Sequence, residues 1–332
     1  MKKSILILLA IIGIIAYLFI NQSNNTINVE LRDFAIEDTS SITKLYFADR
    51  KGNDVTLERS ANGWLVNGKY SARKDAIITT LSTIKNLAVK YPVSEALHNR
   101  IIKNLATNAT KVEIFTNDKE KAFKTYYVGG EPQDLIGSYM LMENSSKAFL
   151  VYIPGFNGFL APRYNVDGST VKSMLWRDRS IFSYNKDSIK SVEVTYHEDT
   201  IKNYKLTKDD KEYTLKAQNK NGTLDNVFGD AYFNLFKNIN CEGFSNNMSF
   251  KDSILNSPPF RTIKVQENNG KTKTLIAYHK GPERAEYQNA YGDKLEYDVD
   301  RMFGKVEEDF MLIQFYVFDK IFLDIDKVSV EK

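Results

Sequence analysis

The sequence predicts an α+β protein in which an N-terminal transmembrane helix is followed by two similar modules of mainly antiparallel sheet covered by helices. Three observations support this fold class. The chain begins with a long apolar run, its 332 residues exceed what one core usually supports, and one order of strand and helix patterns occurs twice. The predicted parts are an anchor (residues 1–20), a linker (21–35), a first α+β module (36–168) and a second module (169–332).

The apolar run, residues 5–20, contains no charged residue and follows Lys2 and Lys3. Cations before an apolar segment stay in the cytoplasm, so the rest of the chain is expected to be exported. As a helix the run spans roughly 24 Å, slightly less than a hydrocarbon core of about 30 Å. No small-x-small cleavage site follows it, which favours an uncleaved anchor over a cleaved signal peptide. We therefore expect a single-pass protein of the bacterial inner membrane that contacts the lipid bilayer through residues 5–20 and has its C-terminal body in the periplasm.

The composition fits a globular body behind this anchor. Hydrophobic residues make up 42% of the chain, enough for sizeable cores. The 45 Lys and Arg residues nearly balance 42 Asp and Glu residues and do not cluster along the sequence, which argues against a nucleic-acid partner. The single cysteine, Cys241, permits no intramolecular disulfide and is interpreted as a small buried residue at the end of a helix.

The elements of the first module follow from local patterns. Residues 41–47 alternate as in a half-buried strand, and residues 62–63, Asn-Gly, suit a tight turn. Ile77 and Ile84 share one stripe of a predicted helix, which residues 90–93 terminate. The strands expected here are 41–47, 54–59, 64–66, 111–115, 124–128, 138–142 and 148–153, and a second helix is expected to begin after Ser94.

The second module repeats this order about 150 residues later, as duplicated modules do. Residues 188–194 match the apolar pattern of residues 41–47, and Val227, Ala231 and Leu235 predict the corresponding helix. Its apolar face is broadened by Phe228, Tyr232, Phe236 and Ile239. Strands followed by helix and then strands again indicate antiparallel sheet rather than a doubly wound parallel sheet. The strands expected here are 188–194, 203–206, 212–215, 262–265, 272–278, 295–299 and 310–318.

Motifs of the common catalytic classes are not found in the sequence. His98, His197 and His279 lie far apart and lack the short spacing of a zinc site. There is no Gly-x-Ser-x-Gly elbow and no phosphate-binding loop. We therefore predict no catalytic residue, no cofactor and no metal site, and the sequence leaves open whether the chain is an enzyme.

Unusual chemistry is concentrated in residues 152–182, which combine aromatic rings with arginines at the junction of the two modules. One interpretation is a clamp between the modules, in which Trp176 fills a pocket and Asp178 pairs with a nearby arginine. The other is a partner-binding patch, because Trp, Tyr and Arg dominate binding hot spots. The residues concerned are Tyr152, Phe156, Arg163, Tyr164, Trp176, Arg177, Asp178 and Arg179.

Four segments, residues 62–70, 124–130, 152–156 and 176–182, resemble the domain-of-unknown-function family 4340. The resemblance covers most of the chain after the anchor and is clearest from residue 41 to residue 182. It implies an anchored envelope protein of the kind found in Bacteroidetes, where similar domains accompany auxiliary components of gliding-motility-type ABC transporters. The family has no established catalytic residues, so the resemblance implies a location and a membrane complex but no activity.

These observations predict a membrane-anchored, extracytoplasmic binding or scaffold protein with an envelope protein as its partner. The alternative is an envelope hydrolase that acts on polysaccharide or peptidoglycan through carboxylates between the modules. Asp298 and Asp300 share one face of a predicted strand, but glycoside hydrolysis needs a second carboxylate across a cleft.

Overall fold

The computed structural model describes residues 32–331 apart from 118, 167–168, 211, 284–287 and 289–291. The predicted anchor, residues 5–20, lies outside the described residues. Among the helices that are described, none is long and apolar enough to cross a membrane. The chain forms two compact units, of which unit 1 ends at Asp178 and unit 2 comprises Arg179–Lys332.

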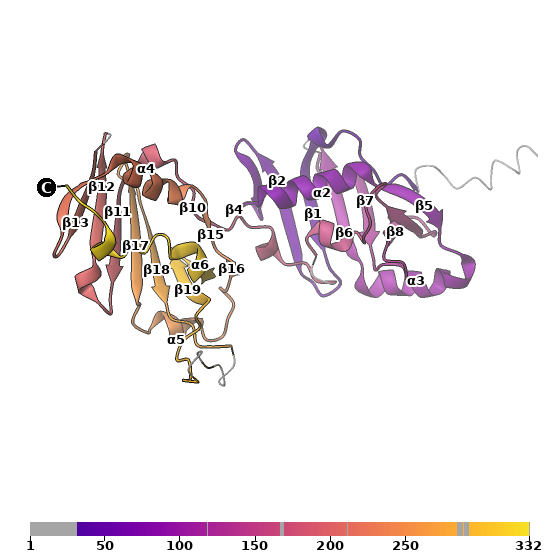
Figure 1. Cartoon of the computed structure of the whole chain (residues 1–332). Coiled ribbons are helices and arrows are strands. Elements are labelled where there is room, and N and C mark those ends of the chain that lie inside the picture. The colour runs from indigo at the N-terminus through magenta and orange to yellow at the C-terminus, as the bar shows by residue number, and fades with distance from the viewer. Residues whose placement is uncertain are drawn as a thin grey trace, which may run out of the picture. The chain divides into compact units, whose positions relative to one another are not determined.

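Unit 1 is built on a nine-stranded, fully antiparallel sheet with the strand order β4-β3-β2-β1-β6-β7-β8-β9-β5 (Figure 1). A meander forms one half, and the strand that follows the first helix, β5, lies at the far edge. The strands are β1 (Ile42–Ala48), β2 (Asp54–Ser60), β3 (Gly63–Val66), β4 (Tyr70–Ser71), β5 (Ala88–Pro92), β6 (Thr110–Thr116), β7 (Lys124–Val128), β8 (Ser138–Met142) and β9 (Phe149–Tyr152).

The two helices of unit 1 cover different faces of this sheet. Helix α2 (Lys74–Asn86) contributes Ile77 and Ile84 to the main core, which also contains the alternate residues Leu45 and Phe47 of β1. Helix α3 (Glu95–Asn108) packs its buried residues against side chains of β7 and β8 on the opposite face. One face is therefore fully covered, and the other only in part.

Unit 2 repeats the topology of unit 1. Its nine-stranded antiparallel sheet has the order β14-β13-β12-β11-β17-β18-β19-β20-β16, which matches unit 1 strand for strand. A separate pair joins β10 (Ser180–Phe182) to β15 (Ile239–Asn240). The strands of the large sheet are β11 (Ile189–Tyr196), β12 (Tyr204–Asp209), β13 (Glu212–Ala217), β14 (Asn221–Leu224), β16 (Gly243–Phe244), β17 (Arg261–Glu267), β18 (Thr272–Tyr278), β19 (Arg301–Val306) and β20 (Asp309–Gln314).

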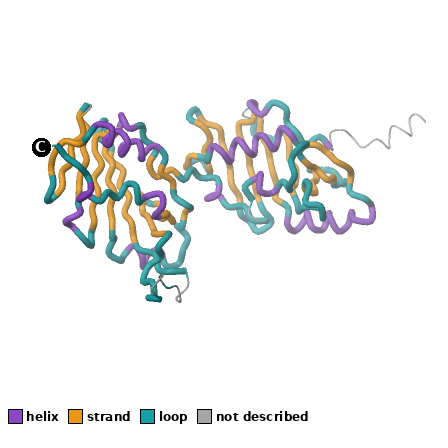
Figure 2. Tube along the Cα trace, in the orientation of Figure 1, coloured by secondary structure: helices purple, strands orange, loops and turns teal. Residues whose placement is uncertain are grey.

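The helices of unit 2 occupy equivalent places. Helix α4 (Asn226–Asn234) packs on the main core, and its first turn is capped by the Asp225 carboxylate. Helix α5 (Lys251–Leu255) packs against side chains of β18, β19 and β20 on the other face, and α6 (Phe315–Phe318) follows β20. Figure 2 shows how strands dominate both units. Short 3-10 helices lie at Thr39–Ser41, Ala161–Tyr164, Ser173–Leu175, Lys186–Ser188, Thr200–Lys202, Leu235–Lys237 and Ile325–Lys327.

The prediction of α+β modules with mainly antiparallel sheet is confirmed for the described residues, but several local predictions are wrong. Residues 295–299 are not a strand, because the Asp298 carboxylate accepts the N–H groups of the next residues and turns the chain. The strand follows as β19 and contains Gly304, where a Cβ would lie 2.9 Å from Leu275. The first helix ends before residues 90–93, as predicted, but these residues overlap the edge strand β5, which was not predicted. Pro92 is tolerated there because an edge strand needs no further N–H donor. The strand predicted at 310–318 divides into β20 and α6.

The buried side of α4 also differs from the predicted stripe. Val227 is 77% exposed, whereas Tyr232 and Phe236 of the predicted face are buried, as are Gly229 and Phe233, which the predicted face does not include. Gly229 allows the helix to approach β13, since a Cβ at this position would lie 2.2 Å from the ring of Tyr213. Glycine is thus required here by the close packing of helix on sheet, a reason that the helical pattern does not contain.

Replacement of Gly229 by alanine should destabilise unit 2, although alanine normally favours a helix interior by about 1 kcal/mol. The added methyl group must displace the buried ring of Tyr213, and such overpacking costs about 1–3 kcal/mol. Urea unfolding followed by circular dichroism measures the change. Asn226→Ala, at the exposed start of the same helix, is the control and should leave stability unchanged or higher. Equal or greater stability of Gly229→Ala would contradict the packing argument.

Candidate functional site

The aromatic residues singled out in the sequence belong to the core of unit 1. Trp176 is 1% exposed, and its ring stacks on Phe47 with 5.1 Å between ring centroids. Tyr164 is buried, and its hydroxyl lies 2.9 Å from that of Tyr126. Burial raises the pKa of both tyrosines, so the pair stays neutral. A partner cannot reach Trp176 or Tyr164 while unit 1 is folded.

The arginines of this segment also bind within their own unit. The guanidinium of Arg163 lies over Phe156, and its Nε donates a hydrogen bond of 2.9 Å to Thr83. Arg177 is buried, with its guanidinium 3.6 Å from the centre of the Tyr70 ring. These contacts hold the chain after β9 against the sheet of unit 1.

Residues 176–178 close one edge of that sheet. The backbone of Arg177 pairs with Ala72, and the N–H of Asp178 donates to the carbonyl of Ser71 in the edge strand β4. An open edge would offer unpaired donors and acceptors to other chains, so this pairing protects it. Tyr152 lies at the end of β9 opposite Ala88, whereas Arg179 belongs to unit 2 and accepts a hydrogen bond from the N–H of Cys241.

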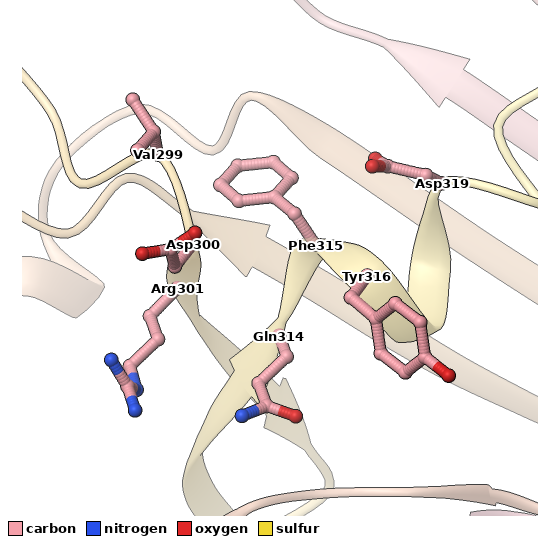
Figure 3. A pocket seen from close by; sticks show the side chains of 7 residues that line it. All are labelled: Val299, Asp300, Arg301, Gln314, Phe315, Tyr316 and Asp319. Atoms are coloured by element: carbon pink, nitrogen blue, oxygen red, sulfur yellow. The ribbon is translucent and has the colours of Figure 1, made fainter.

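A more accessible site lies in unit 2, where β19 begins and β20 passes into α6. It is an open pocket of about 480 Å³ (Figure 3). Arg301 and Gln314 are paired across β19 and β20, and their side chains point the same way. The lining residues are Val299, Asp300, Arg301, Gln314, Phe315, Tyr316 and Asp319.

A largely buried ion pair fixes the backbone of this pocket. The Asp298 carboxylate lies 2.7 Å from the Lys280 ammonium group and accepts the N–H groups of Asp300 and Arg301 at 2.8 and 2.9 Å. Burial acts to raise the pKa of Asp298, but the hydrogen bonds from Lys280 and from the two N–H groups outweigh it and lower the pKa. The N–H of Phe315 in turn donates to the carbonyl of Asp300 at 3.0 Å, which joins the two sides of the pocket.

The charges within the pocket differ in how far they are compensated. The Nε of Arg301 donates to Glu242 at 2.8 Å, and this bond raises the pKa of Arg301. The carboxylates of Asp300 and Asp319 are on exposed residues, and Figure 3 shows them on either side of the Phe315 ring. A ligand or partner group with a positive charge or a hydroxyl could therefore bind them without displacing Arg301 from its own partner.

Exposed apolar side chains accompany these polar groups. Tyr316 is 77% exposed and Val299 is 62% exposed, although Tyr316 follows the end of β20 and Val299 precedes the start of β19. Apolar side chains gathered at one place on a surface are typical of interaction sites, and tyrosine is common at their centres. Sequence reasoning missed this site because Tyr316 falls in the predicted strand 310–318.

The same region is where the two units differ most in chain length. The connection between β7 and β8 in unit 1 comprises residues 129–137, whereas the equivalent connection between β18 and β19 comprises residues 279–300. Its base is held by His279, whose ring stacks between Phe260 and Tyr297 at 4.1 and 3.9 Å. Long connections in compact domains are usually functional, and this excess was a signal that could have located the site.

The ionisable side chains that line the pocket are those of Asp300, Arg301, Tyr316 and Asp319. Its lining contains no Ser, Cys, His or Lys, so it offers no nucleophile activated by a neighbouring base. Over the described part of the chain, no group of three or more His, Cys, Asp or Glu side chains could hold a metal ion.

Comparisons with known proteins agree with the resemblance seen in the sequence. A family model described as a domain of unknown function (DUF4340) matches residues 64–258, more than half of the chain. The chain has no match among curated proteins and none among solved structures.

Replacement of Trp176 by alanine should destabilise unit 1 by about 3–5 kcal/mol, because it leaves a large cavity against Phe47. Urea unfolding of the full chain in detergent, followed by circular dichroism, measures the effect. Tyr91→Ala removes a ring that is about half exposed in the same unit and should cost much less. An unchanged unfolding midpoint for Trp176→Ala would show that this side chain is not a core residue.

Replacement of Asp298 by asparagine should weaken the base of the pocket by about 1–3 kcal/mol at neutral pH, since Lys280 loses its charged partner. Because the pKa of Asp298 is lower in the folded chain than in the unfolded chain, its stabilising effect is present above about pH 4. The effect is lost as the pH falls through the lower, folded value. Hydrogen-exchange protection of β18 and β19 should therefore differ between the two proteins at pH 7 and converge in acid. A difference that does not change with pH would refute this role.

Proposed function

We propose that this chain, which belongs to the DUF4340 family, is a membrane-anchored binding or scaffold protein of the bacterial envelope. The uncharged apolar run of residues 5–20 behind two lysines supports an anchor in the inner membrane with the body in the periplasm. The family resemblance supports an accessory role in an envelope complex, such as one formed around an ABC transporter in Bacteroidetes.

The observation that carries a binding role is the exposure of Tyr316 and Val299 beside a pocket with a rigid frame. Apolar side chains grouped at one place on a surface are typical of interaction sites, and these two are exposed beside Asp300 and Phe315, which a backbone hydrogen bond joins. A protein partner of matching chemistry presents an apolar side chain to Tyr316 and a basic or hydroxyl group to Asp300 and Asp319. Such a partner would bury the tyrosine ring and pair the carboxylates.

The alternative function, an envelope hydrolase, requires an acid and a second carboxylate placed across a bound sugar. The pocket holds two carboxylates, those of Asp300 and Asp319, but both belong to exposed residues of an open pocket rather than to a deep cleft that encloses a sugar. The binding role is therefore the one that the chemistry of the pocket supports better.

A photo-crosslinking residue at position 316 should capture one defined partner in native membranes, because Tyr316 is expected to be buried at the interface. The adduct should stay in the membrane fraction after alkaline carbonate extraction, as an anchored chain does. Val299→Asp should reduce its yield at least severalfold by placing a charge in the apolar contact.

The matched control is the same crosslinker at Val227, which is as exposed as Tyr316 and lies in the same unit. It should give no such adduct. Equal labelling from both positions, or an adduct that Val299→Asp leaves unchanged, would contradict a partner-binding role for this pocket.

A further inference from the structure

The outer face of the sheet in unit 2 carries a second feature, distinct from the pocket. We propose that this face binds an acidic polysaccharide through lysine side chains that follow one another across neighbouring strands. The inference does not depend on the pocket or on its partner, since it concerns other residues of the same unit.

The side-chain alternation of the strands places these lysines together. Residues of β11, β12, β13 and β17 alternate between the main core and the outer face, as successive residues in a strand must. Lys216 of β13 pairs with Lys205 of β12, which pairs with Glu193 of β11, which pairs with Lys264 of β17. Four cross-strand neighbours thus form one row that contains three lysines and one glutamate, and we call it the lysine row.

The lysine row is not neutralised by the rest of the described chain. No hydrogen bond, ion pair or ring contact joins the ammonium groups of Lys205, Lys216 or Lys264 to any described residue, and Glu193 has no ion pair there either. Lys216 and Lys264 are exposed, and Lys205 is half-buried. Lysines directly opposite one another repel, and Glu193 on the other side of Lys205 offsets part of the repulsion between Lys205 and Lys216.

The carboxylates near this row differ in how far they are compensated. Asp209 lies 3.1 Å from the ammonium group of Lys190, whereas Glu212 accepts a hydrogen bond from the neutral hydroxyl of Thr223 and keeps its charge. Glu193 lies between Lys205 and Lys264, so the row itself carries three positive charges and one negative charge. Lys305 of β19, paired with Ile276 of β18, adds a further cation on the same face.

Hydroxyl and amide groups surround the lysine row in place of apolar side chains. The outer positions of β11, β12 and β13 other than the lysines hold only polar or charged residues. Ammonium and hydroxyl donors together can bind both the carboxylates and the hydroxyl groups of an acidic sugar chain. The neighbours on this face that are not buried are Thr195, Thr207, Thr214, Thr262, Gln266 and Thr274.

Unit 1 provides an internal control, because its sheet has the same strand order. On its outer face Lys44 lies opposite Glu58 and its ammonium group is 3.9 Å from the ring of Phe115. Lys111 forms an ion pair of 2.6 Å with Glu113. A row of unpaired lysines is therefore not a requirement of this fold, and its presence in unit 2 alone points to binding.

The chemistry of the face favours a polysaccharide over the other anionic partners. Protein interfaces are depleted in lysine at their centres and are held by aromatic, Met and Arg residues, which the lysine row and its neighbours lack. The outer positions of β11, β12 and β13 around the lysine row hold no apolar side chain that could enter a lipid layer. Strands lie about 4.8 Å apart, so Lys216 and Lys205 present cations on adjacent strands and Lys264 presents a third beyond Glu193, to a polymer that carries one carboxylate on each sugar ring.

The test uses the full chain in nanodiscs of phosphatidylcholine and fluorescent polygalacturonate as the probe. The triple variant Lys205→Gln, Lys216→Gln, Lys264→Gln should weaken binding by about tenfold, because each exposed ion pair contributes modestly. Binding by the unchanged chain should also fall as salt is raised. The matched control Lys74→Gln, Lys103→Gln, Lys237→Gln removes the same charge from exposed positions elsewhere and should bind as the unchanged chain does.

Two comparators identify the source of the anion. Dextran, a neutral polysaccharide, should not compete, and neither should added vesicles of phosphatidylglycerol. Competition by the vesicles alone would replace the polysaccharide by a lipid surface and overturn the proposal. An equal loss of binding in both triple variants would also overturn it, because net charge rather than the lysine row would then be responsible. Loss of the partner adduct at position 316 with intact polysaccharide binding would affect the proposed function but not this inference.

Discussion

The structure depends on one constraint, that every strand has two faces and each sheet buries only one of them completely. In both units the first helix and the chain that follows the sheet cover one face with the main core. The second helix, α3 or α5, covers only part of the other face. The remainder must be polar or bound, because apolar residues left there would promote association. The surfaces available for function are therefore the uncovered half-faces and the ends of the strands.

The repeated topology separates what the fold needs from what function adds. Both sheets share one strand order, so features found in both, such as a helix over the core face, serve the fold. Features confined to one unit require another explanation. In both units the chain after the sheet closes the same edge, through residues 176–178 beside Ser71 and Ala72 in unit 1 and through Glu331 beside Thr223 of β14 in unit 2, so this closure also serves the fold. The long connection before β19 and the lysine row occur in unit 2 only. The contrast assigns a structural task to the edge closure and binding tasks to the other two features.

Local patterns predicted the strands well where alternation is regular. Residues 124–128, 138–142 and 272–278 form β7, β8 and β18 with the expected bounds. Prediction was wrong where a distant residue decides the local structure, as for Gly229 beneath the Tyr213 ring. The burial of Trp176 could not be read from the sequence, because the same residue types make both cores and hot spots. The lysine row depends on the cross-strand register, which joins residues far apart in the chain. A search for runs of charge along the sequence therefore does not find it.

Arginine is used inside unit 1 and lysine on the outer face of unit 2, and this difference fits the different tasks proposed for the two places. Arg163 and Arg177 lie over aromatic rings inside unit 1, where a planar, weakly hydrated guanidinium can be buried. The lysine row keeps compact ammonium groups in water on flexible stems, which can follow anions whose spacing varies. A folded partner of fixed shape would favour the rigid fork of arginine, whereas a flexible acidic polymer is better matched by lysine.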